Sequence, residues 1–289
     1  MHEQRRRFLQ WLLFIAGTLS LGAQCLPARG AETVHFRSGD GQTDLIGYVF
    51  RPNGAGPHAA VVMLHGRGGP YSSLAKGVYT ADTLSARHKF WGEFWASHGY
   101  VALLVDSFGP RGFWRGFPKA SYEDRPSEVS EQTVRPLDAY GALAYLRKRP
   151  DVVGDRIGLQ GWSNGAMTAL AAMSSRAPGI ANPSPASGFR AALTFYPGCG
   201  MEAIQGAYMP YAPIQMFVGT EDEEVSAKRC IAWEKRVLSA GGSIELTAYE
   251  GAQHDFDDPS ASRQRNEANA AATRDAVRRS EEFFGRQLK

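Results

Sequence analysis

A serine flanked by glycines, set between a strand pattern and a helix pattern, constrains this chain more than any other feature. The short apolar run at residues 157–160 leads into residues 161–165, which read Gly-Trp-Ser-Asn-Gly, and strong helix formers follow at residues 166–173. A serine at the apex of a sharp strand-to-helix turn leaves no room for bulky neighbours two positions away, and both of those positions are glycine. The segment predicts a nucleophilic Ser163 at the carboxyl edge of a sheet.

Strand and helix patterns alternate along the rest of the chain, which indicates an α/β protein. Residues 33–36 and 45–50 are typical of two strands joined by a polar turn. Further strands are expected at residues 59–64, 100–105, 157–160, 191–196, 214–218 and 244–249. Helices are expected at residues 90–98, 135–149, 163–174, 226–238 and 263–287. This alternation predicts a mostly parallel sheet covered by helices on both faces. The connection at residues 197–213 is too short for a large cap domain.

The first 30 residues have the pattern of an export signal. Three arginines at residues 5–7 precede an apolar run at residues 11–21 that is too short for a membrane span. An arginine pair followed by x-Phe-Leu resembles a twin-arginine signal. We therefore expect residues 1–30 to be a signal peptide and residues 31–289 to form a single domain. The mature protein would then be periplasmic or secreted, without a stable membrane anchor; an uncleaved amino-terminal anchor is the alternative.

The charge balance excludes some partners. The chain has a formal net charge of +3, and residues 1–30 account for all of it. The remainder has no basic stripe interleaved with aromatic residues, so we expect no nucleic-acid partner. Beyond the signal the chain keeps Cys199 and Cys230. In an exported protein an even pair predicts a disulfide, with two buried free thiols as the alternative.

The order of residues along the chain selects partners for the serine. A serine hydroxyl needs a base to take its proton, and the base needs an acid that orients it. On this kind of sheet the order is serine, acid, histidine. His254 is the one histidine beyond Ser163, and Asp222 is the one aspartate between them. Both directly follow predicted strands, so we expect a Ser163–His254–Asp222 triad, with Glu221 in the same acidic loop as the substitute acid.

The oxyanion formed during attack needs backbone donors near the serine. We expect one from the amide of Asn164, and another from the amide of Gly66 or Arg67 in the loop after the third strand. His65 in that loop is interpreted mainly as a structural residue at the strand end. It is also kept as a candidate substrate contact.

Two long connections, at residues 68–89 and 107–134, leave the carboxyl ends of buried strands and are rich in aromatic residues. We expect them to wall a substrate pocket; the alternative is that they merely cover the core. The candidate substrate-binding residues are His65, Arg111, Trp114, Arg115 and Trp162. The guanidinium of Arg67, Arg111 or Arg115 is a candidate partner for a substrate carboxylate. No cluster has metal-ligand spacing and no phosphate loop follows a strand, so no metal or cofactor is expected.

Five motifs together resemble the dienelactone hydrolase family of the α/β-hydrolase fold. They are Leu-His-Gly-Arg-Gly-Gly at residues 64–69, Asp-Ser-Phe-Gly-Pro-Arg-Gly at 106–112, Gly-Trp-Ser-Asn-Gly at 161–165, Phe-Tyr-Pro-Gly-Cys at 195–199 and Gln-His-Asp-Phe at 253–256. The resemblance spans nearly all of the chain beyond the signal and implies hydrolysis of esters or lactones without a cofactor. The founding members use cysteine where this chain has Ser163, and they are cytoplasmic. The chain is therefore more similar to an exported branch with a serine nucleophile.

The sequence thus predicts a serine hydrolase that cleaves a small-molecule carboxylic ester or lactone by two-step acyl transfer. A peptidase or a polyester hydrolase with the same triad is the alternative among enzymes. A catalytically inactive exported binding protein is the alternative outside enzymes. The oligomeric state is left open.

Overall fold

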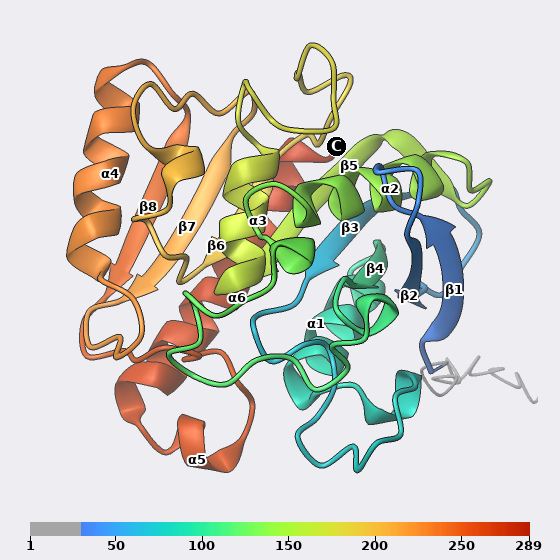
Figure 1. The fold of residues 1–289 in the computed structure, drawn as a ribbon, viewed down its shortest axis with the longest axis horizontal. Helices are drawn as coiled ribbons and strands as arrows, with labels where there is room; N and C mark the ends of the chain where they lie inside the picture. The colour runs from blue at the N-terminus through green and yellow to red at the C-terminus, as the bar shows by residue number, and fades with distance from the viewer. Residues whose placement is uncertain (1–29) are drawn as a thin grey trace, which may run out of the picture.

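The computed structural model describes residues 30–289, which form one eight-stranded sheet between two layers of helices (Figure 1). The predicted signal peptide lies outside the described residues except for its last position, and so it stays a prediction. In sheet order the strands are β1 (Glu32–Arg37), β2 (Asp44–Phe50), β4 (Val101–Asp106), β3 (His58–Leu64), β5 (Val152–Trp162), β6 (Ala192–Phe195), β7 (Ile214–Gly219) and β8 (Ile244–Tyr249). β2 pairs antiparallel with β1 and β4, and the other neighbours are parallel.

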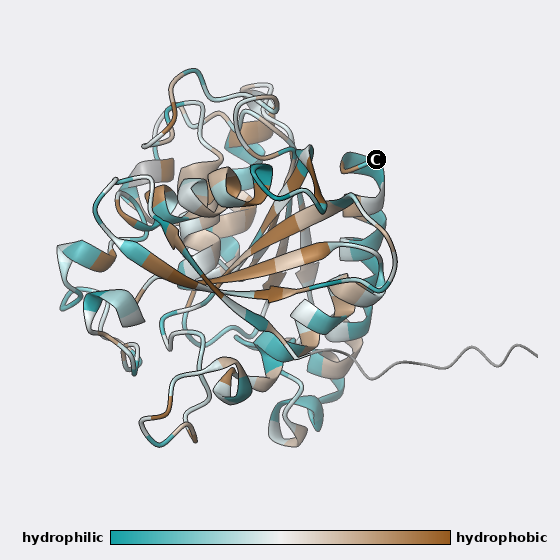
Figure 2. Cartoon of the chain, turned by 90° about the vertical axis from the view of Figure 1, so that its right-hand side faces the viewer, coloured by the Kyte–Doolittle hydropathy of each residue, from teal (hydrophilic) through white to brown (hydrophobic). Residues whose placement is uncertain are grey.

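Helices cover both faces of the sheet, as the alternating pattern predicted. One face carries α2 (Arg135–Arg147), α3 (Asn164–Ala172) and α4 (Ala227–Ser239), and the other carries α1 (Ala86–Ser97) and α6 (Glu267–Gln287). Strand β3 shows why its sequence is apolar throughout. Val62 and Leu64 pack in the first layer, whereas Val61 and Met63 pack in the second. Figure 2 shows the hydrophobic residues concentrated on the strands between these layers.

The helix predicted at roughly residues 263–287 is present as α6 but is interrupted near its start. The chain forms a short α5 (Ala261–Gln264) and then begins α6 at Glu267. Asn266 causes the break because its side chain caps α6, accepting hydrogen bonds from the amides of Ala268 (2.9 Å) and Asn269 (3.2 Å). Asparagine competes well for such cap positions, so the interruption has a local origin.

A disulfide fastens the connection that follows β6. Cys199 and Cys230 are bonded, with their Cα atoms 5.1 Å apart, and this joins the connection to α4. Between residues 197 and 213 the chain forms one short 3₁₀ turn, Glu202–Ile204, and no cap domain. None of the helices in the described part of the chain has the length and apolar content that a membrane span requires.

Candidate active site

Ser163 occupies the turn between β5 and α3 in a backbone conformation that few side chains adopt. Its φ is +50° and its ψ is −114°. The flanking glycines are required by contact distances. A Cβ at Gly161 would lie 2.2 Å from the carbonyl oxygen of Gly165, and a Cβ at Gly165 would lie 2.0 Å from that of Leu64. The absence of side chains therefore lets α3 pack directly against the ends of β5 and β3.

A continuous hydrogen-bonded chain links the three residues predicted as a triad. Ser163 Oγ lies 3.0 Å from His254 Nε2, and His254 Nδ1 lies 2.8 Å from Asp222 Oδ2. The other oxygen of Asp222 accepts the amides of Glu224 and Val225, each at 2.8 Å. The side chains of His254 and Asp222 are 2% and 1% exposed. The neighbouring Glu221, the substitute acid, is exposed, so the structure brings Asp222 to the histidine instead.

The surroundings of His254 favour its charged form. Burial lowers the pKa of the imidazole, but the hydrogen bond that it donates to Asp222 and the carboxylates of Asp255 and Glu224 raise it, and the net pKa lies above the ordinary 6.5. When Nδ1 donates to Asp222, the neutral ring presents its lone pair at Nε2. Nε2 is the atom that faces Ser163, so the ring is oriented to receive the serine proton.

The loop that carries His254 is anchored by Asp257, which sequence reasoning missed. Its buried carboxylate accepts the indole N–H groups of Trp91 (2.9 Å) and Trp162 (2.8 Å) and the hydroxyl of Tyr196. The Tyr196 ring in turn lies 4.6 Å from the imidazole of His254. Trp162 was predicted as a substrate contact, and the structure contradicts this because the side chain is fully buried in this network.

Arg87, in α1, forms ion pairs with the loop that carries His254. Its guanidinium pairs with Asp255 at 2.8 Å and with Asp257 at 3.3 Å. Burial raises the pKa of Asp255, but Arg87 and His254 lower it to about 2 overall. Asp255, which follows the histidine directly, has a φ of +57° and so depends on such contacts to keep its conformation.

The residues predicted to supply oxyanion donors surround the serine. Gly66 and Arg67 line the same cavity as Ser163, and a Cβ at Gly66 would lie 3.6 Å from the Cβ of Ser163. Asn164 is the first residue of α3. Its amide therefore belongs to the helix terminus that points at the serine, where backbone N–H groups lack intrahelical partners.

Arg135, at the start of α2, connects the loop after β3 with the start of α3. Sequence reasoning also missed this residue. It is fully buried, and it donates to the side-chain oxygen of Asn164 and to the carbonyl oxygen of His65 (2.9 Å). Its guanidinium lies over the ring of Phe108, 4.9 Å from the centroid. Burial lowers the pKa of Arg135 to about 10, so it stays cationic at neutral pH. One buried side chain thus contacts both the turn at residues 161–165 and the loop after β3, and it fixes their relative position.

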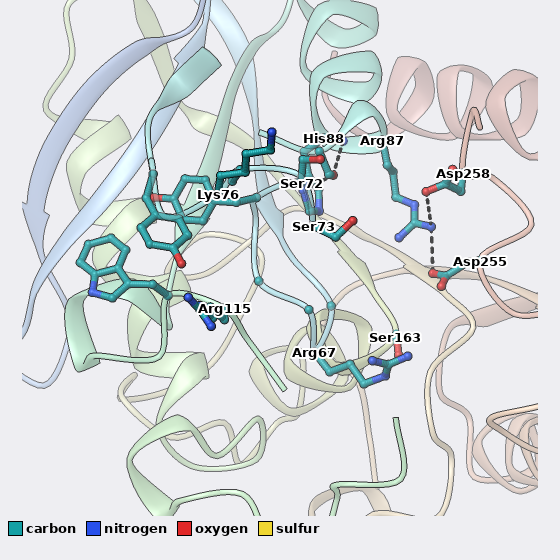
Figure 3. Close-up of a pocket in the computed structure, with 18 of the residues that line it drawn as sticks. Arg67, Ser72, Ser73, Lys76, Arg87, His88, Arg115, Ser163, Asp255 and Asp258 are labelled. Atoms are coloured by element: carbon teal, nitrogen blue, oxygen red, sulfur yellow. Dashed lines mark hydrogen bonds and ion pairs between the residues drawn. The ribbon is translucent and has the colours of Figure 1, made fainter. Parts of the chain in front are cut away.

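Ser163 and His254 both line a cavity of about 780 Å³. Figure 3 shows Ser163 among the residues around it. The first long connection lines one side of this cavity through residues between 71 and 79, and its contact with a substrate stays a prediction. The second connection contributes Trp114 and Arg115, both predicted as substrate contacts. Tyr79 stacks on Trp114 with ring centroids 5.3 Å apart, and Tyr71 lies 5.0 Å from Tyr79. The cavity therefore has an aromatic wall on the side of these two connections.

Two other candidate substrate contacts lie away from the cavity. His65 is fully buried, and its Nε2 accepts the amide of Ser107 at 3.2 Å. Arg111 makes two hydrogen bonds of 2.8 Å to the buried carboxylate of Asp138. Sequence spacing could not show this because Asp138 is 27 positions along the chain. Both predictions of substrate contact are therefore wrong.

Three groups of the kinds that bind metals come together beside the serine. Ligand atoms of Glu224, His254 and Asp255 lie within 4.8 Å of one another. The sequence did not indicate this cluster because it comes from two loops. Each group already has protein partners: Glu224 pairs with Arg67, His254 with Asp222, and Asp255 with Arg87. The cluster therefore belongs to the network of ion pairs and hydrogen bonds around the site.

Comparison with known proteins agrees with this fold. The model of the dienelactone hydrolase family matches residues 45–288. The chain belongs to the dienelactone hydrolase family. This family of ester-bond hydrolases was the one that the sequence motifs indicated. The matched part includes the predicted nucleophile turn at residues 161–165. It also includes the loop after β7 that carries Asp222, the acid loop, and the loop after β8 that carries His254, the histidine loop.

Individual relatives are more distant. One relative is a protein from Bradyrhizobium sp that is assigned as a 2-oxo-3-(5-oxofuran-2-ylidene)propanoate lactonase. It is 28% identical to this chain over 169 residues. The match covers 56% of this chain and 64% of the relative, which is less than two thirds of its length. Esterase Est2 from Thermogutta terrifontis, with propionate bound, superposes with a TM-score of 0.63 at 20% identity, over 90% of this chain and 96% of the esterase. A candidate dienelactone hydrolase from Klebsiella pneumoniae gives 0.67 at 16% identity, over 89% and 99%. These structural likenesses establish the α/β-hydrolase fold.

Proposed function

We propose that this protein is a serine hydrolase that cleaves carboxylic esters or lactones by two-step acyl transfer. The observation that carries the proposal is the hydrogen-bonded chain from Ser163 through His254 to Asp222 at the mouth of a cavity. Family membership supports the reaction class. A small molecule is the substrate favoured by a cavity of about 780 Å³ with one aromatic wall.

In the first step Ser163 Oγ bonds to the substrate carbonyl carbon while its proton passes to His254 Nε2. The imidazolium then gives that proton to the leaving alkoxide, the carbon–oxygen bond breaks, and an acyl-serine remains. In the second step His254 takes a proton from water, the hydroxide displaces Ser163, and the serine recovers its proton. Asp222 holds the ring and stabilises its positive charge in both steps.

The negative oxygen of each tetrahedral intermediate needs donors that are already in place. We assign this role to the amides of Asn164 and of Gly66 or Arg67, at the N-terminus of α3 and in the loop after β3. Removal of one such donor typically costs about 3 to 4 kcal/mol of transition-state stabilisation. Arg135 supports both segments, so it is a positioning residue for this reaction.

The lactone form of the substrate is supported by the assigned activity of the Bradyrhizobium relative. Export to the periplasm or medium remains part of the proposal, and the disulfide between Cys199 and Cys230 is consistent with an oxidising compartment. The serine at position 163 fits general ester hydrolysis. The acyl and alcohol groups are a matter for a substrate panel.

The deciding experiment compares the purified protein with Ser163→Ala on p-nitrophenyl acetate and butyrate, a simple lactone and a peptide amide. We expect turnover of at least one ester or lactone and a loss of about 10⁴-fold or more in the variant, because the nucleophile is removed. Circular dichroism and thermal unfolding establish that the variant is folded. Equal rates in both proteins, or hydrolysis confined to the amide, would contradict the proposal.

A further inference from the structure

A second carboxylate lies close to the catalytic face of His254. Glu224 Oε2 is 3.8 Å from His254 Nε2, on the opposite side of the ring from the bond to Asp222. This distance is too long for a hydrogen bond but short enough for strong attraction to a protonated ring. Glu224 also follows Asp222 by two residues, and its amide donates to Asp222 Oδ1 at 2.8 Å. The acid loop thus supplies two carboxylates to one histidine.

Two cations hold Glu224 in this position. Arg67 donates to both carboxylate oxygens, at 3.1 Å and 3.0 Å, and Lys119 approaches one of them at 2.8 Å. Burial raises the pKa of Glu224, but these cations and His254 lower it to about 2, so it is ionised throughout the working range of a hydrolase. The side chain of Glu224 is 15% exposed, which limits the screening of its charge by solvent.

Arg67 is itself fixed by the second long connection. Its guanidinium donates to the carbonyl oxygen of Phe117 at 3.2 Å, and the Phe117 amide donates to the Arg67 carbonyl at 2.8 Å. Figure 3 shows its side chain extending toward Ser163. A carboxylate released from Arg67 would be free to approach Nε2, where it would compete with Ser163 for the imidazole.

We propose that Glu224 is a second acidic partner of His254, which stabilises the imidazolium formed as Ser163 loses its proton. Arg67 holds it beyond hydrogen-bond distance, so that Nε2 stays available to the serine. Glu224 keeps its charge throughout and takes no proton. It is a positioning residue that acts through the histidine, and this inference rests on the proposed serine hydrolase function.

Other charged and titratable groups near the ring also influence the pKa of His254. Asp222 binds Nδ1, and Asp255 follows the histidine in the chain. The further groups that face the ring or its carboxylates from neighbouring elements are Tyr196 at the end of β6, Arg87 from α1, Glu223 from the acid loop, and Arg67 and Lys119. Among these groups, the Glu224 carboxylate lies 3.8 Å from Nε2, so its neutralisation tests one defined contribution.

The test measures the pH dependence of kcat/KM with a p-nitrophenyl ester from pH 5 to 9 in Glu224→Gln. We expect the acidic limb to move to lower pH by about 0.5 to 1 unit, because the imidazolium loses one nearby anion whose charge is partly offset by Arg67 and Lys119. The plateau should fall about three- to tenfold, because the base becomes weaker. Glu221→Gln is the matched control: it removes an exposed carboxylate from the same loop and should leave the limb in place.

Arg67→Met tests the second half of the proposal while it keeps the backbone amide. We expect its kcat to fall further than that of Glu224→Gln, because Glu224 is then free to approach Nε2. The double variant Arg67→Met/Glu224→Gln should be more active than Arg67→Met alone. A double variant at or below the product of the two single losses would show that the pair supports structure only, and would overturn the proposal.

NMR titration of the His254 ring provides a readout that does not need a substrate. The signal is assigned by its loss in His254→Gln, and its pKa is compared in wild type and Glu224→Gln. A lower pKa in Glu224→Gln supports the inference even if no ester is turned over, which would count against the proposed function alone. An unchanged pKa in an active enzyme would overturn the inference alone. This titration also decides the matter if Arg67→Met does not fold.

Discussion

Replacement of Arg135 by methionine tests whether one buried side chain organises the site. Methionine retains an apolar stem of similar length. It removes the guanidinium that lies over Phe108, and it leaves the side-chain oxygen of Asn164 and the carbonyl of His65 without their donor. A buried acceptor without a partner costs about 1 to 3 kcal/mol, so two of them should lower the free energy of unfolding by about 2 to 6 kcal/mol. Both segments also carry assigned oxyanion donors. We therefore expect kcat/KM to fall by about 10²-fold, the effect of displacing one such donor.

Arg147→Met is the matched control for this change. Arg147 lies in the same helix and donates to the backbone carbonyls of Gly154 (3.1 Å) and Ser187 (2.8 Å), and none of these three residues lines the cavity at Ser163. It should lower stability without a comparable loss of activity. Urea unfolding gives the first quantity, and kcat/KM measured where both variants are folded gives the second. If Arg135→Met loses no more activity than Arg147→Met, the guanidinium supports the fold and not the donors, and the reasoning fails.

Three further outcomes follow from the same structure. The acidic limb of kcat/KM should lie above pH 6.5, because only the neutral ring accepts the Ser163 proton and the folded-state pKa of His254 is raised; a limb below pH 6.5 would contradict the assigned surroundings. The raised pKa of His254 also contributes to the free energy of unfolding. This contribution is complete below the pKa of the histidine in the unfolded chain, and it is lost as pH rises through its pKa in the folded protein. Urea midpoints at pH 6 and pH 9 would detect the loss. Replacement of Cys199 and Cys230 by serine should lower the free energy of unfolding by about 3 to 4 kcal/mol on the chain-entropy estimate, and denaturation of the double variant without reductant measures this; a loss below about 1 kcal/mol would show that the cross-link constrains the unfolded chain little.

Some parts of the site could be predicted from the sequence, because they depend on neighbouring residues or on the order of residues along the chain. The glycines around Ser163 reflect contacts within one turn, and a single sequence records them directly. Asp222 and His254 could be selected because a parallel sheet brings successive strand ends to one edge, which converts order along the chain into proximity. Element boundaries were less accurate. β5, for example, runs over Val152–Trp162, whereas the apolar run indicated residues 157–160.

The supporting residues could not be predicted, because their partners are distant in sequence and carry no pattern. Asp257 joins indoles 95 and 166 positions away, and Arg67 meets Glu224 across 157 positions. The wrong assignments have the same cause. Arg111 and Trp162 have the residue types of substrate contacts, but each has a buried carboxylate partner that only the tertiary structure reveals.

Three arginines hold together the loops at the carboxyl ends of the strands, where the described residues form no cap domain. Arg135 joins the loop after β3 to the nucleophile turn, Arg87 joins α1 to the histidine loop, and Arg67 joins the loop after β3 to the acid loop. Each guanidinium makes at least two polar contacts at once because its donors form a rigid planar fork. Lysine at these positions would keep the charge but not the geometry. Long loops would otherwise have to order when substrate binds, and the energy needed for that would be lost from catalysis. Loops held in advance by buried ion pairs and hydrogen bonds can instead present their donors in place, which is the condition that electrostatic stabilisation of an oxyanion requires.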